Sequence, residues 1–260
     1  MNGNFIGVFD SGAGGITILK EMKKMLPKES FVYFGDSLYT PYGDRSEDWI
    51  RERSLVIASM LVENGAKALV IACNTASAAG AAAVREKYPD IPVVAVEPAL
   101  KLAVDESKKS HLENPAFLVM ATDATLRLEK YHTLEEKLHD DANFIPLPCV
   151  GLADRIEKGD FDGEDLKVYL EEKLSEYKGK VDGVILGCTH YPLIKKQIAN
   201  AVGDVPMYDG ANGCARRLKD LLEKNDLCSE GDGEIVYLTS SPEEGVTEKY
   251  RSLYKMTGDK

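Results

Sequence analysis

Short apolar runs alternate with longer amphipathic stretches along almost the whole chain. The amphipathic stretches, such as 46–65 and 163–180, place apolar residues at three- and four-residue steps, begin with a capping or acidic residue and end near Gly, as helices do. The apolar runs predict buried strands at 5–10, 30–36, 68–73, 93–97, 116–122, 143–148, 181–188, 205–209 and 234–240. Strands this continuously apolar are covered on both faces, which requires parallel sheets with helical crossovers. The pattern therefore predicts an α/β fold with mainly parallel sheets flanked by helices.

One strand motif occurs twice. The stretches "KALVIACNT" (67–75) and "DGVILGCTH" (182–190) both run from an apolar strand into a cysteine and then into polar residues. Their cysteines, Cys73 and Cys188, are 115 residues apart (188 − 73), close to half of the 260-residue chain. The repeat predicts two related halves with one thiol at the end of an equivalent strand in each, although a short motif can also repeat by chance.

Polar and titratable residues recur where the predicted strands end. Ligands of parallel sheets collect at the carboxyl ends of the strands, where loops and helix N-termini meet. The residues at these ends are Asp10-Ser11, Asp36-Ser37, Cys73-Asn74-Thr75, Thr122 and Cys188-Thr189-His190. We expect each cysteine to lie at a strand-to-helix turn, where the helix dipole and free N–H groups favour the thiolate. The alternative for either one is a small buried hydrophobe.

Two thiols with matched surroundings suit the inversion of a stereocentre. One thiolate takes a proton from carbon while the other thiol gives a proton to the opposite face. Helix N-termini and hydroxyl groups such as that of Ser11 can hold a substrate carboxylate. Asp10 can accept an ammonium group or assist Cys73, and His190 can tune Cys188 or relay its proton.

Composition narrows the class of protein. The net charge of −11, from 43 acidic and 32 basic residues, argues against nucleic acid as the primary ligand. No apolar stretch approaches the roughly 20 residues of a membrane span, and the first ten residues lack the features of a signal peptide. The five cysteines are an odd number without CxxC or zinc-ligand spacing, which predicts a reducing cytoplasm and no metal site.

Two features of the sequence could indicate a cofactor. The stretch "DSGAGGITIL" (10–19) could cradle a phosphate, but Thr17 stands where G-x-G-x-x-G needs its last Gly, and the Lys of a Walker motif is missing. A pyridoxal mechanism is conceivable because Lys is abundant, yet no lysine lies in an apolar strand-end context like that of Cys73. We therefore expect no cofactor.

Five stretches together identify a family resemblance. They are "IGVFDSGAGGITILKEM" (6–22), "YFGDSLYTPYG" (33–43), "VIACNTASA" (70–78), "MATDAT" (120–125) and "VILGCTHYPLI" (185–194). They resemble the glutamate racemases of the cofactor-independent aspartate/glutamate racemase superfamily. The resemblance implies two similar α/β domains with the active site in the cleft between them. It assigns 1–97 plus 208–260 to the domain carrying Asp10 and Cys73, and 98–207 to the domain carrying Cys188 and His190.

The resemblance also implies the reaction and its residues. The substrate would be glutamate, interconverted between its L and D forms by α-proton transfer between two cysteines, and the D form would supply peptidoglycan synthesis. Cys73 and Cys188 would transfer the protons, Asp10 and His190 would assist them, and Asp36 and Glu157 would support the site. The residues expected to bind substrate are Asp10, Ser11, Tyr42, Gly43, Asn74, Thr75, Thr122, Thr125, Thr189 and His190.

The sequence departs from the family pattern in a few places. Tyr39 stands where many relatives carry Arg, Leu128 stands where Ser is usual, and the surroundings of Cys149 and the stretch 208–213 also differ. None of these departures removes a proton-transfer residue. An aspartate racemase and a non-catalytic amino-acid-binding module remain the alternatives, and the oligomeric state, with a homodimer as one candidate, is left open.

Overall fold

A computed structural model describes residues 4–256 and divides the chain into two compact units. Unit 1 contains the residues up to Val96 and those from Ala211 onward, and unit 2 contains Glu97–Gly210. The boundaries expected from the sequence were 97/98 and 207/208. Unit 1 is therefore built from two separate segments of the chain, and unit 2 from one.

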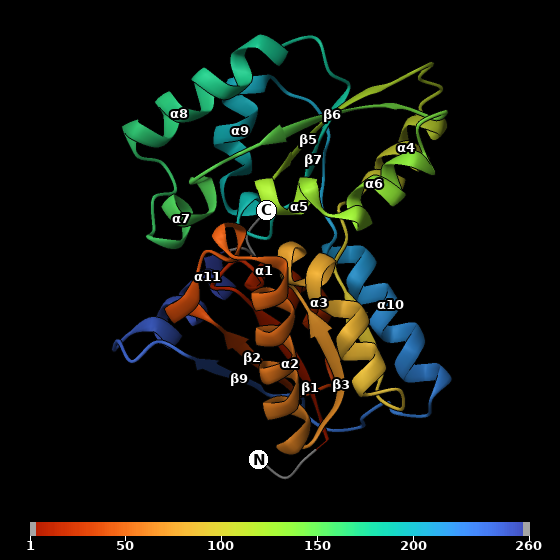
Figure 1. Cartoon of the computed structure of the whole chain (residues 1–260), viewed down its shortest axis with the longest axis vertical. Helices are drawn as coiled ribbons and strands as arrows, with labels where there is room; N and C mark the ends of the chain where they lie inside the picture. Colours follow the sequence, from red (N-terminus) through yellow and green to blue (C-terminus); the bar gives the residue numbers. More distant parts are fainter. Residues whose placement is uncertain (1–3, 257–260) are drawn as a thin grey trace. The chain divides into compact units, whose positions relative to one another are not determined.

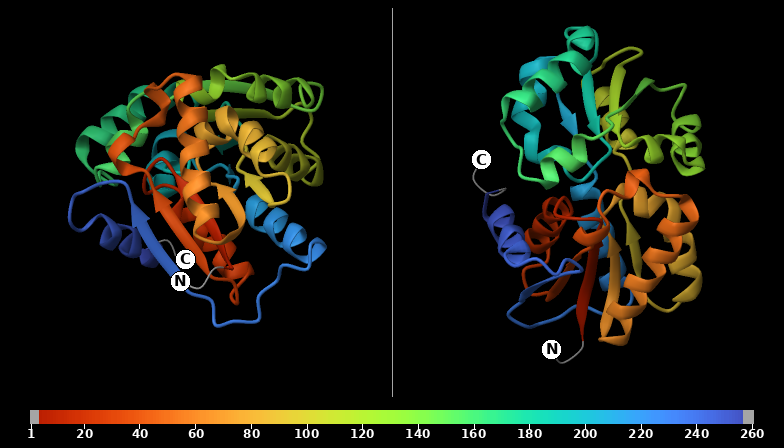
Figure 2. Two further views of the ribbon diagram at one scale, coloured as in Figure 1. Left: turned by 60° about the horizontal axis from the view of Figure 1, so that its bottom comes forward. Right: turned by 60° about the vertical axis from the view of Figure 1, so that its left-hand side comes forward.

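Unit 1 is built on a five-stranded sheet in the order β4-β3-β1-β2-β9, in which every neighbouring pair is parallel. Its strands are β1 (Phe5–Asp10), β2 (Phe31–Gly35), β3 (Ala66–Ile71), β4 (Val93–Ala95) and β9 (Ile235–Thr239). Figure 2 shows the blue strand β9 beside the strands of the N-terminal segment, and Phe31 of β2 is paired with Ile235. The C-terminal segment thus completes the sheet that carries Asp10 and Cys73.

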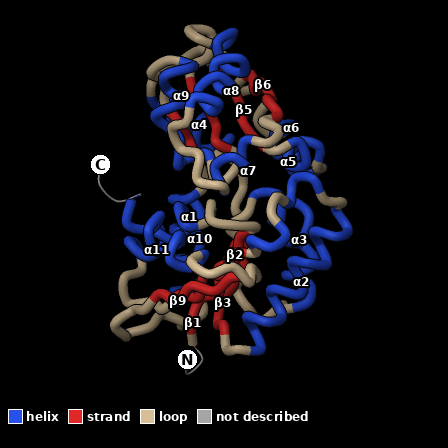
Figure 3. The backbone as a smooth tube through the Cα atoms, turned by 90° about the vertical axis from the view of Figure 1, so that its left-hand side faces the viewer, coloured by secondary structure: helices blue, strands red, loops and turns tan. Residues whose placement is uncertain are grey.

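Helices cover both faces of this sheet (Figure 3). One face carries α1 (Ile16–Met25), α10 (Ala211–Lys224) and α11 (Val246–Met256). The other face carries α2 (Glu47–Glu63) and α3 (Asn74–Lys87), which pack against each other. Two short 3-10 helices, η1 (Ser37–Tyr39) and η2 (Tyr42–Asp44), lie in the loop between β2 and α2.

Unit 2 is built on a four-stranded parallel sheet in the order β6-β5-β7-β8 (Figure 1). Its strands are β5 (Ala116–Ala121), β6 (Asn143–Pro148), β7 (Gly183–Leu186) and β8 (Met207–Tyr208). One core forms between the sheet and α7 (Leu152–Glu157), α8 (Glu164–Leu174) and α9 (Lys195–Val202). A second core forms on the opposite face under α4 (Leu100–Lys109), α5 (Asp123–Arg127) and α6 (Glu129–Glu136).

The predicted α/β class with parallel sheets flanked by helices is confirmed, and each of the nine apolar runs contains a strand. The predicted helix 46–65 forms as α2, where Ser46 Oγ accepts from Trp49 N at 3.3 Å, and Gly65 follows with φ 96°. The predicted helix 163–180 is wrong at its end. It stops at Leu174, and a 3-10 helix, η3 (Ser175–Tyr177), follows it. Within residues 4–256 no helix is long and apolar enough to cross a membrane.

A buried ion pair fastens the segment between α10 and β9 to the rest of unit 1. The Lys67 ammonium lies 2.7 Å from Glu29 Oε2, and the two side chains are only 7% and 3% exposed. Lys67 also donates to the Leu227 carbonyl and to Ser229 Oγ, both at 2.6 Å. Ser229 N donates to Glu29 Oε1 at 2.7 Å. Charges removed from water in this way need such partners, because an unpaired buried ion is strongly destabilising.

Candidate active site

The turn after β1 is built around the buried carboxylate of Asp10. Gly12 N donates to Asp10 Oδ1 at 2.9 Å, so the side chain closes the turn that follows its own strand. Gly15 lies against the same side chain: a Cβ at this position would approach Asp10 Cβ to 2.7 Å and Ala72 Cβ to 3.0 Å. Such distances are too short for carbon atoms in contact, so glycine at position 15 is required by the space that Asp10 occupies.

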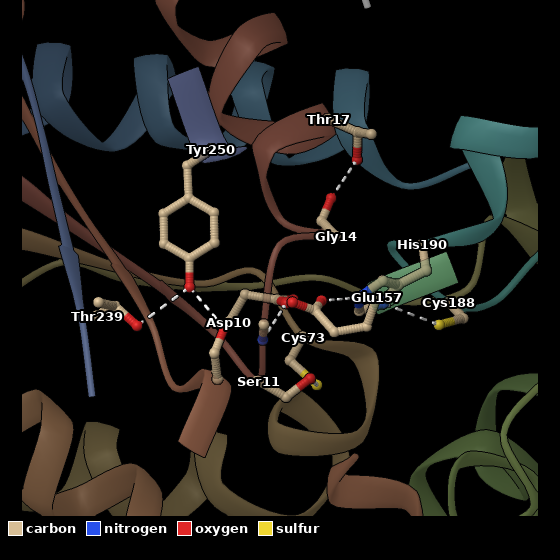
Figure 4. A network of polar contacts seen from close by, with 12 residues as sticks. Asp10, Ser11, Gly14, Thr17, Cys73, Glu157, Cys188, His190, Thr239 and Tyr250 are labelled. Atoms are coloured by element: carbon tan, nitrogen blue, oxygen red, sulfur yellow. Dashed lines mark hydrogen bonds and ion pairs between the residues drawn. The ribbon is translucent and has the colours of Figure 1, made fainter. Parts of the chain in front are cut away.

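The remainder of the Gly-rich stretch starts helix α1. Gly15 precedes the helix, and the Thr17 hydroxyl donates to the Gly14 carbonyl at 2.9 Å within the first turn (Figure 4). Thr17, which interrupts the dinucleotide-binding pattern, is thus a helix-start residue whose side chain bonds to the backbone three residues before it.

Cys73 lies at the N-cap of α3 and is 6% exposed. The predicted strand 68–73 ends at Ile71, two residues earlier than expected, because Cys73 takes the N-cap position. Its Sγ accepts from Ala76 N at 3.5 Å and lies 3.6 Å from Ser11 Oγ, to which the thiol can donate (Figure 4). The N-terminus of a 14-residue helix and a direct N–H contact both favour negative charge on this sulfur.

Asn74, directly after Cys73, carries an unused acceptor. Its side chain is buried, and its Oδ1 has no hydrogen-bond partner within residues 4–256. A buried amide oxygen without a partner costs free energy unless a ligand supplies a donor. Asn74 Oδ1 can therefore accept from a donor such as a substrate ammonium group.

The loop after β2 is fixed by Asp36, which is fully buried. Its Oδ2 accepts from Tyr42 OH at 2.5 Å and from Arg53 Nε at 2.7 Å, and its Oδ1 accepts from Arg53 Nη2 at 2.6 Å. Burial, followed by the negative charge of Asp36, raises the pKa of Tyr42 far above its ordinary value, so Tyr42 acts as a hydrogen-bond donor. Asp36 also raises the pKa of Arg53, chiefly through their hydrogen bonds. The sequence had not indicated Arg53, which is one of several charged residues in α2.

Tyr39, which departs from the family pattern, contacts Arg53 in this loop. The Arg53 guanidinium lies over the Tyr39 ring, 4.4 Å from its centroid. Trp49 packs against Tyr39 and Tyr42, with centroids 5.8 and 5.5 Å apart. A cation over an aromatic face is attracted by the ring quadrupole, so Tyr39 helps to hold the guanidinium that neutralises Asp36.

In unit 2, Cys188, Thr189 and His190 follow β7, as the sequence predicted, and all three are buried. The expected strand-to-helix turn at Cys188 is present, but the helix that follows it first is not an α-helix. A 3-10 helix, η4 (Tyr191–Ile194), comes first, and α9 begins only at Lys195. Pro192 stands at the start of η4 and lacks the N–H that such a turn would offer. Cys188 therefore depends on side chains rather than on a helix N-terminus for its electrostatic surroundings.

Those side chains form a chain of three groups, shown in Figure 4. Glu157 Oε2 lies 2.7 Å from His190 Nε2, and His190 Nδ1 lies 3.8 Å from Cys188 Sγ. Complete burial on its own lowers the pKa of His190, but hydrogen bonds to Cys188 and Glu157 and their negative charges outweigh it and raise the pKa well above its usual value. The imidazole thus lies between the Glu157 carboxylate and the Cys188 sulfur, where it can exchange a proton with either group.

Thr122 follows β5 directly, and Thr125 lies in the short helix α5. Thr122 Oγ1 caps the short helix α5 by accepting from Thr125 N at 3.2 Å, and the two hydroxyl oxygens are 2.9 Å apart. Thr125 is buried and Thr122 half-buried. Two hydroxyl groups are thereby fixed at the carboxyl end of β5, beside the strand that leads to Cys188.

Cys149 is a buried neighbour of this site, 2% exposed. Burial, followed by the charge of nearby Cys188, raises the pKa of Cys149 to about 12. Its thiol donates to the Leu147 carbonyl at 3.5 Å. Cys149 is therefore a neutral core thiol in the same hydrophobic cluster as Cys188.

The structure gathers the residues indicated by the sequence into two groups, each at the carboxyl ends of the strands of its own sheet. The group in unit 1 contains Asp10, Ser11, Asp36, Tyr42, Gly43, Cys73, Asn74 and Thr75. The group in unit 2 contains Thr122, Thr125, Glu157, Cys188, Thr189 and His190. Each group holds one of the two repeated cysteines.

Replacing Glu157 by Gln is expected to lower the pKa of His190, because the imidazolium loses its carboxylate partner. A histidine with a raised folded-state pKa stabilises the protein below its unfolded pKa, and this contribution is lost as the pH rises through the folded pKa. In the variant the loss should therefore occur at lower pH than in the wild type. NMR titration of the four histidines measures the shift directly.

Glu135→Gln is the matched control for this experiment. Glu135 lies 3.7 Å from His132 in an exposed pair, and such pairs interact weakly. The His190 titration should be unchanged in this control. An unchanged His190 titration in Glu157→Gln would contradict the assignment of Glu157 as its charge partner.

Comparison with known proteins places these features in a family. A sequence model of the Asp/Glu/hydantoin racemase family matches residues 6–218. The glutamate racemase of Clostridium perfringens is 43% identical over 255 residues, which cover 96% of each chain. That of Stutzerimonas stutzeri is 40% identical over 241 residues, 92% of this chain and 89% of the other.

Solved structures agree with the sequence relatives. The Francisella tularensis glutamate racemase in complex with D-glutamate superposes with a TM-score of 0.82 at 32% identity, covering 99% of this chain and 94% of that one. The Escherichia coli enzyme in complex with L-glutamate and an activator gives a TM-score of 0.81 at 29% identity, covering 97% and 95%. With a family match over most of its length and relatives of this similarity, the chain belongs to the Asp/Glu/hydantoin racemase family.

Proposed function

We propose that the chain is a glutamate racemase that interconverts L- and D-glutamate with Cys73 and Cys188 as its two acid/base groups. The observation that carries the proposal is the pair of buried, unbridged thiols, each at the carboxyl end of a central strand of its own unit and each among polar side chains. The relatives named glutamate racemase at about 40% identity over nearly the whole chain support glutamate as the substrate.

The proton balance of the reaction requires two thiols in opposite states. The thiolate on one face of the α-carbon takes the α-proton and becomes a thiol. The thiol on the other face gives its proton to the carbanion and becomes a thiolate. The reverse reaction exchanges the two roles, so both thiols act in both directions. No cofactor takes part, because both proton transfers are made by cysteine side chains.

The two thiols have different helpers in this scheme. Asp10 and Ser11 lie beside Cys73, and a carboxylate there can receive the thiol proton as the sulfur turns into a base. His190, held by Glu157, assists Cys188 as an imidazolium that stabilises the thiolate. Asp36 supports the loop that carries Tyr42 and Gly43.

The proposed substrate contacts are hydroxyl, amide and backbone N–H groups that suit a carboxylate and an ammonium group. They come from Asp10, Ser11, Tyr42, Gly43, Asn74, Thr75, Thr122, Thr125, Thr189 and His190. We also propose that the D-glutamate formed supplies peptidoglycan synthesis in the cytoplasm.

Incubation with each enantiomer of glutamate and of aspartate in deuterated water tests the proposal. Both enantiomers of glutamate should gain deuterium at the α-carbon and lose optical rotation, as followed by NMR and circular dichroism. Labelling of aspartate in place of glutamate would identify an aspartate racemase. Tight binding of glutamate without any labelling would identify an amino-acid-binding module and overturn the proposal.

A further inference from the structure

A tyrosine that the sequence did not indicate holds the turn of Asp10. Tyr33 lies in β2, and its side chain is fully buried. Its hydroxyl donates to the Gly12 carbonyl at 2.6 Å. Gly12 N donates to the Asp10 carboxylate at 2.9 Å. Both backbone polar groups of Gly12 are therefore hydrogen-bonded, the N–H to Asp10 and the carbonyl to Tyr33.

The Tyr33 ring is in turn held by the C-terminal helix α11. The Tyr250 ring packs edge-on against it, with centroids 5.4 Å apart and planes at 78°. The Tyr250 hydroxyl lies 2.6 Å from Ser37 Oγ and 3.4 Å from Thr239 Oγ1, the second contact being shown in Figure 4. Edge-to-face pairs of aromatic rings are favourable beyond the area that they bury. Tyr250 of α11 thus contacts Ser37 after β2 directly, and it is linked to the turn after β1 through the Tyr33 ring.

Gly35 leaves the space for this arrangement. A Cβ at this position would collide with the Tyr250 hydroxyl and would lie 2.9 Å from the Gly12 carbonyl oxygen. The backbone of β2 therefore lies against both partners of Tyr33. Any side chain at position 35 would force the C-terminal helix and the Asp10 turn apart, so the glycine allows the two to lie close together.

We propose that Tyr33 is a positioning residue whose hydroxyl sets the Asp10–Gly12 turn, so that the Asp10 carboxylate is held ready for the Cys73 thiol. The proposal rests on the proposed function where it gives Asp10 a part in proton transfer. Without the hydroxyl, the buried Gly12 carbonyl loses its donor, and the turn relaxes to find another. The Asp10 carboxylate then moves relative to Cys73, although neither residue is itself changed.

Tyr33→Phe tests this proposal, because it removes one oxygen atom and keeps the ring that contacts Tyr250. The matched control is Tyr237→Phe. Tyr237 pairs in register with Tyr33 on the neighbouring strand, and its ring lies 6.4 Å from that of Tyr33. The first readout is the rate at which iodoacetamide alkylates Cys73 as a function of pH, measured by mass spectrometry of the peptide containing it. Cys188 in the same sample is the internal control.

A carboxylate close to a thiol disfavours the thiolate, so relaxation of Asp10 should move the midpoint of Cys73 alkylation to lower pH. We expect a shift of about half a pH unit in Tyr33→Phe, with no shift at Cys188 and none in Tyr237→Phe. The second readout is kcat for glutamate, which should fall about tenfold because the proton acceptor is misplaced. Tyr250→Leu, which removes the supporting ring, should shift Cys73 in the same direction and serves if Tyr33→Phe does not fold.

An unchanged Cys73 profile in the folded Tyr33→Phe protein would overturn the proposal. Equal shifts at Cys73 and Cys188, or an equal effect of Tyr237→Phe, would also overturn it, because these results indicate general loosening of the fold. Absence of racemase activity in the wild type would refute the proposed function alone, since the alkylation profiles can be compared without turnover.

Discussion

Replacing either Cys73 or Cys188 by Ala is expected to lower the rate of glutamate racemisation by about 10³-fold or more, because each direction of the reaction needs one base and one acid. Loss of one thiol leaves either no base or no proton donor for the opposite face. The measurement is the initial rate of change in circular dichroism from L- and from D-glutamate. Far-UV spectra should remain those of the wild type, since the substitution removes only one sulfur atom.

The two variants should also differ from each other in a defined way. In deuterated water, a single remaining thiolate can still remove the α-proton from the enantiomer that faces it, exchange that proton for a deuteron of the solvent, and return the deuteron to the same face. Any residual α-deuteration should therefore be confined to one enantiomer in Cys73→Ala and to the other in Cys188→Ala. This result would assign each cysteine to its enantiomer.

Cys149→Ala is the control for the loss of a buried thiol. Cys149 is as buried as Cys188, but it is a neutral core residue. Its replacement should lower stability at most and leave turnover in place. Retention of more than a few per cent of the wild-type rate in Cys73→Ala or Cys188→Ala would show that the reaction does not use two cysteine bases.

Replacing Lys67 by Met is expected to lower the free energy of unfolding of unit 1 by about 3–5 kcal/mol, the usual cost of leaving one member of a buried ion pair without its partner. Glu29 would remain buried with its charge unpaired, and the Leu227 carbonyl and Ser229 hydroxyl would lose their shared donor. Urea unfolding followed by tryptophan fluorescence measures the loss. The single tryptophan, Trp49, lies in α2 of unit 1, so its signal reports this unit.

Lys28→Met is the matched control. Lys28 forms an ion pair with Glu230 in which both side chains are largely exposed, at 61% and 84%. Exposed pairs contribute little to stability, because water and salt screen their charges, so this variant should unfold close to the wild-type midpoint. Equal destabilisation by the two substitutions would show that burial does not increase the contribution of the Lys67–Glu29 pair to the free energy of unfolding.

The sequence predicted the framework of the site well, because strands and their ends are local features. The apolar run before Cys73 defines a buried strand, and a polar residue after a parallel strand lies at the ligand-binding edge of the sheet wherever the strand is placed. The position of Asp10 and of Cys188 follows from the same pattern. These residues could be predicted from the local sequence, without the contacts between distant parts of the chain.

The supporting residues could not be found in this way, because their roles depend on contacts between distant parts of the chain. Arg53 is one charged residue among several on α2, and only the folded loop shows that it neutralises Asp36. Tyr33 looks like any aromatic residue of a buried strand until its hydroxyl is seen at Gly12, 21 residues away. The two Cys motifs also look alike in sequence, yet α3 begins directly after Cys73, whereas the 3-10 helix η4 stands between Cys188 and α9.

The completion of unit 1 by β9 and α11 has a consequence for how the protein is made. Unit 2 is one continuous segment, so every residue of its sheet has been synthesised once translation has passed β8. Unit 1 begins first but must wait for β9, and until then β2 presents an unpaired edge, a feature that invites pairing with other chains. The nascent chain should therefore fold in the reverse of the usual N-terminal-first order. Its period of greatest risk of aggregation lies between the emergence of β2 and the emergence of β9.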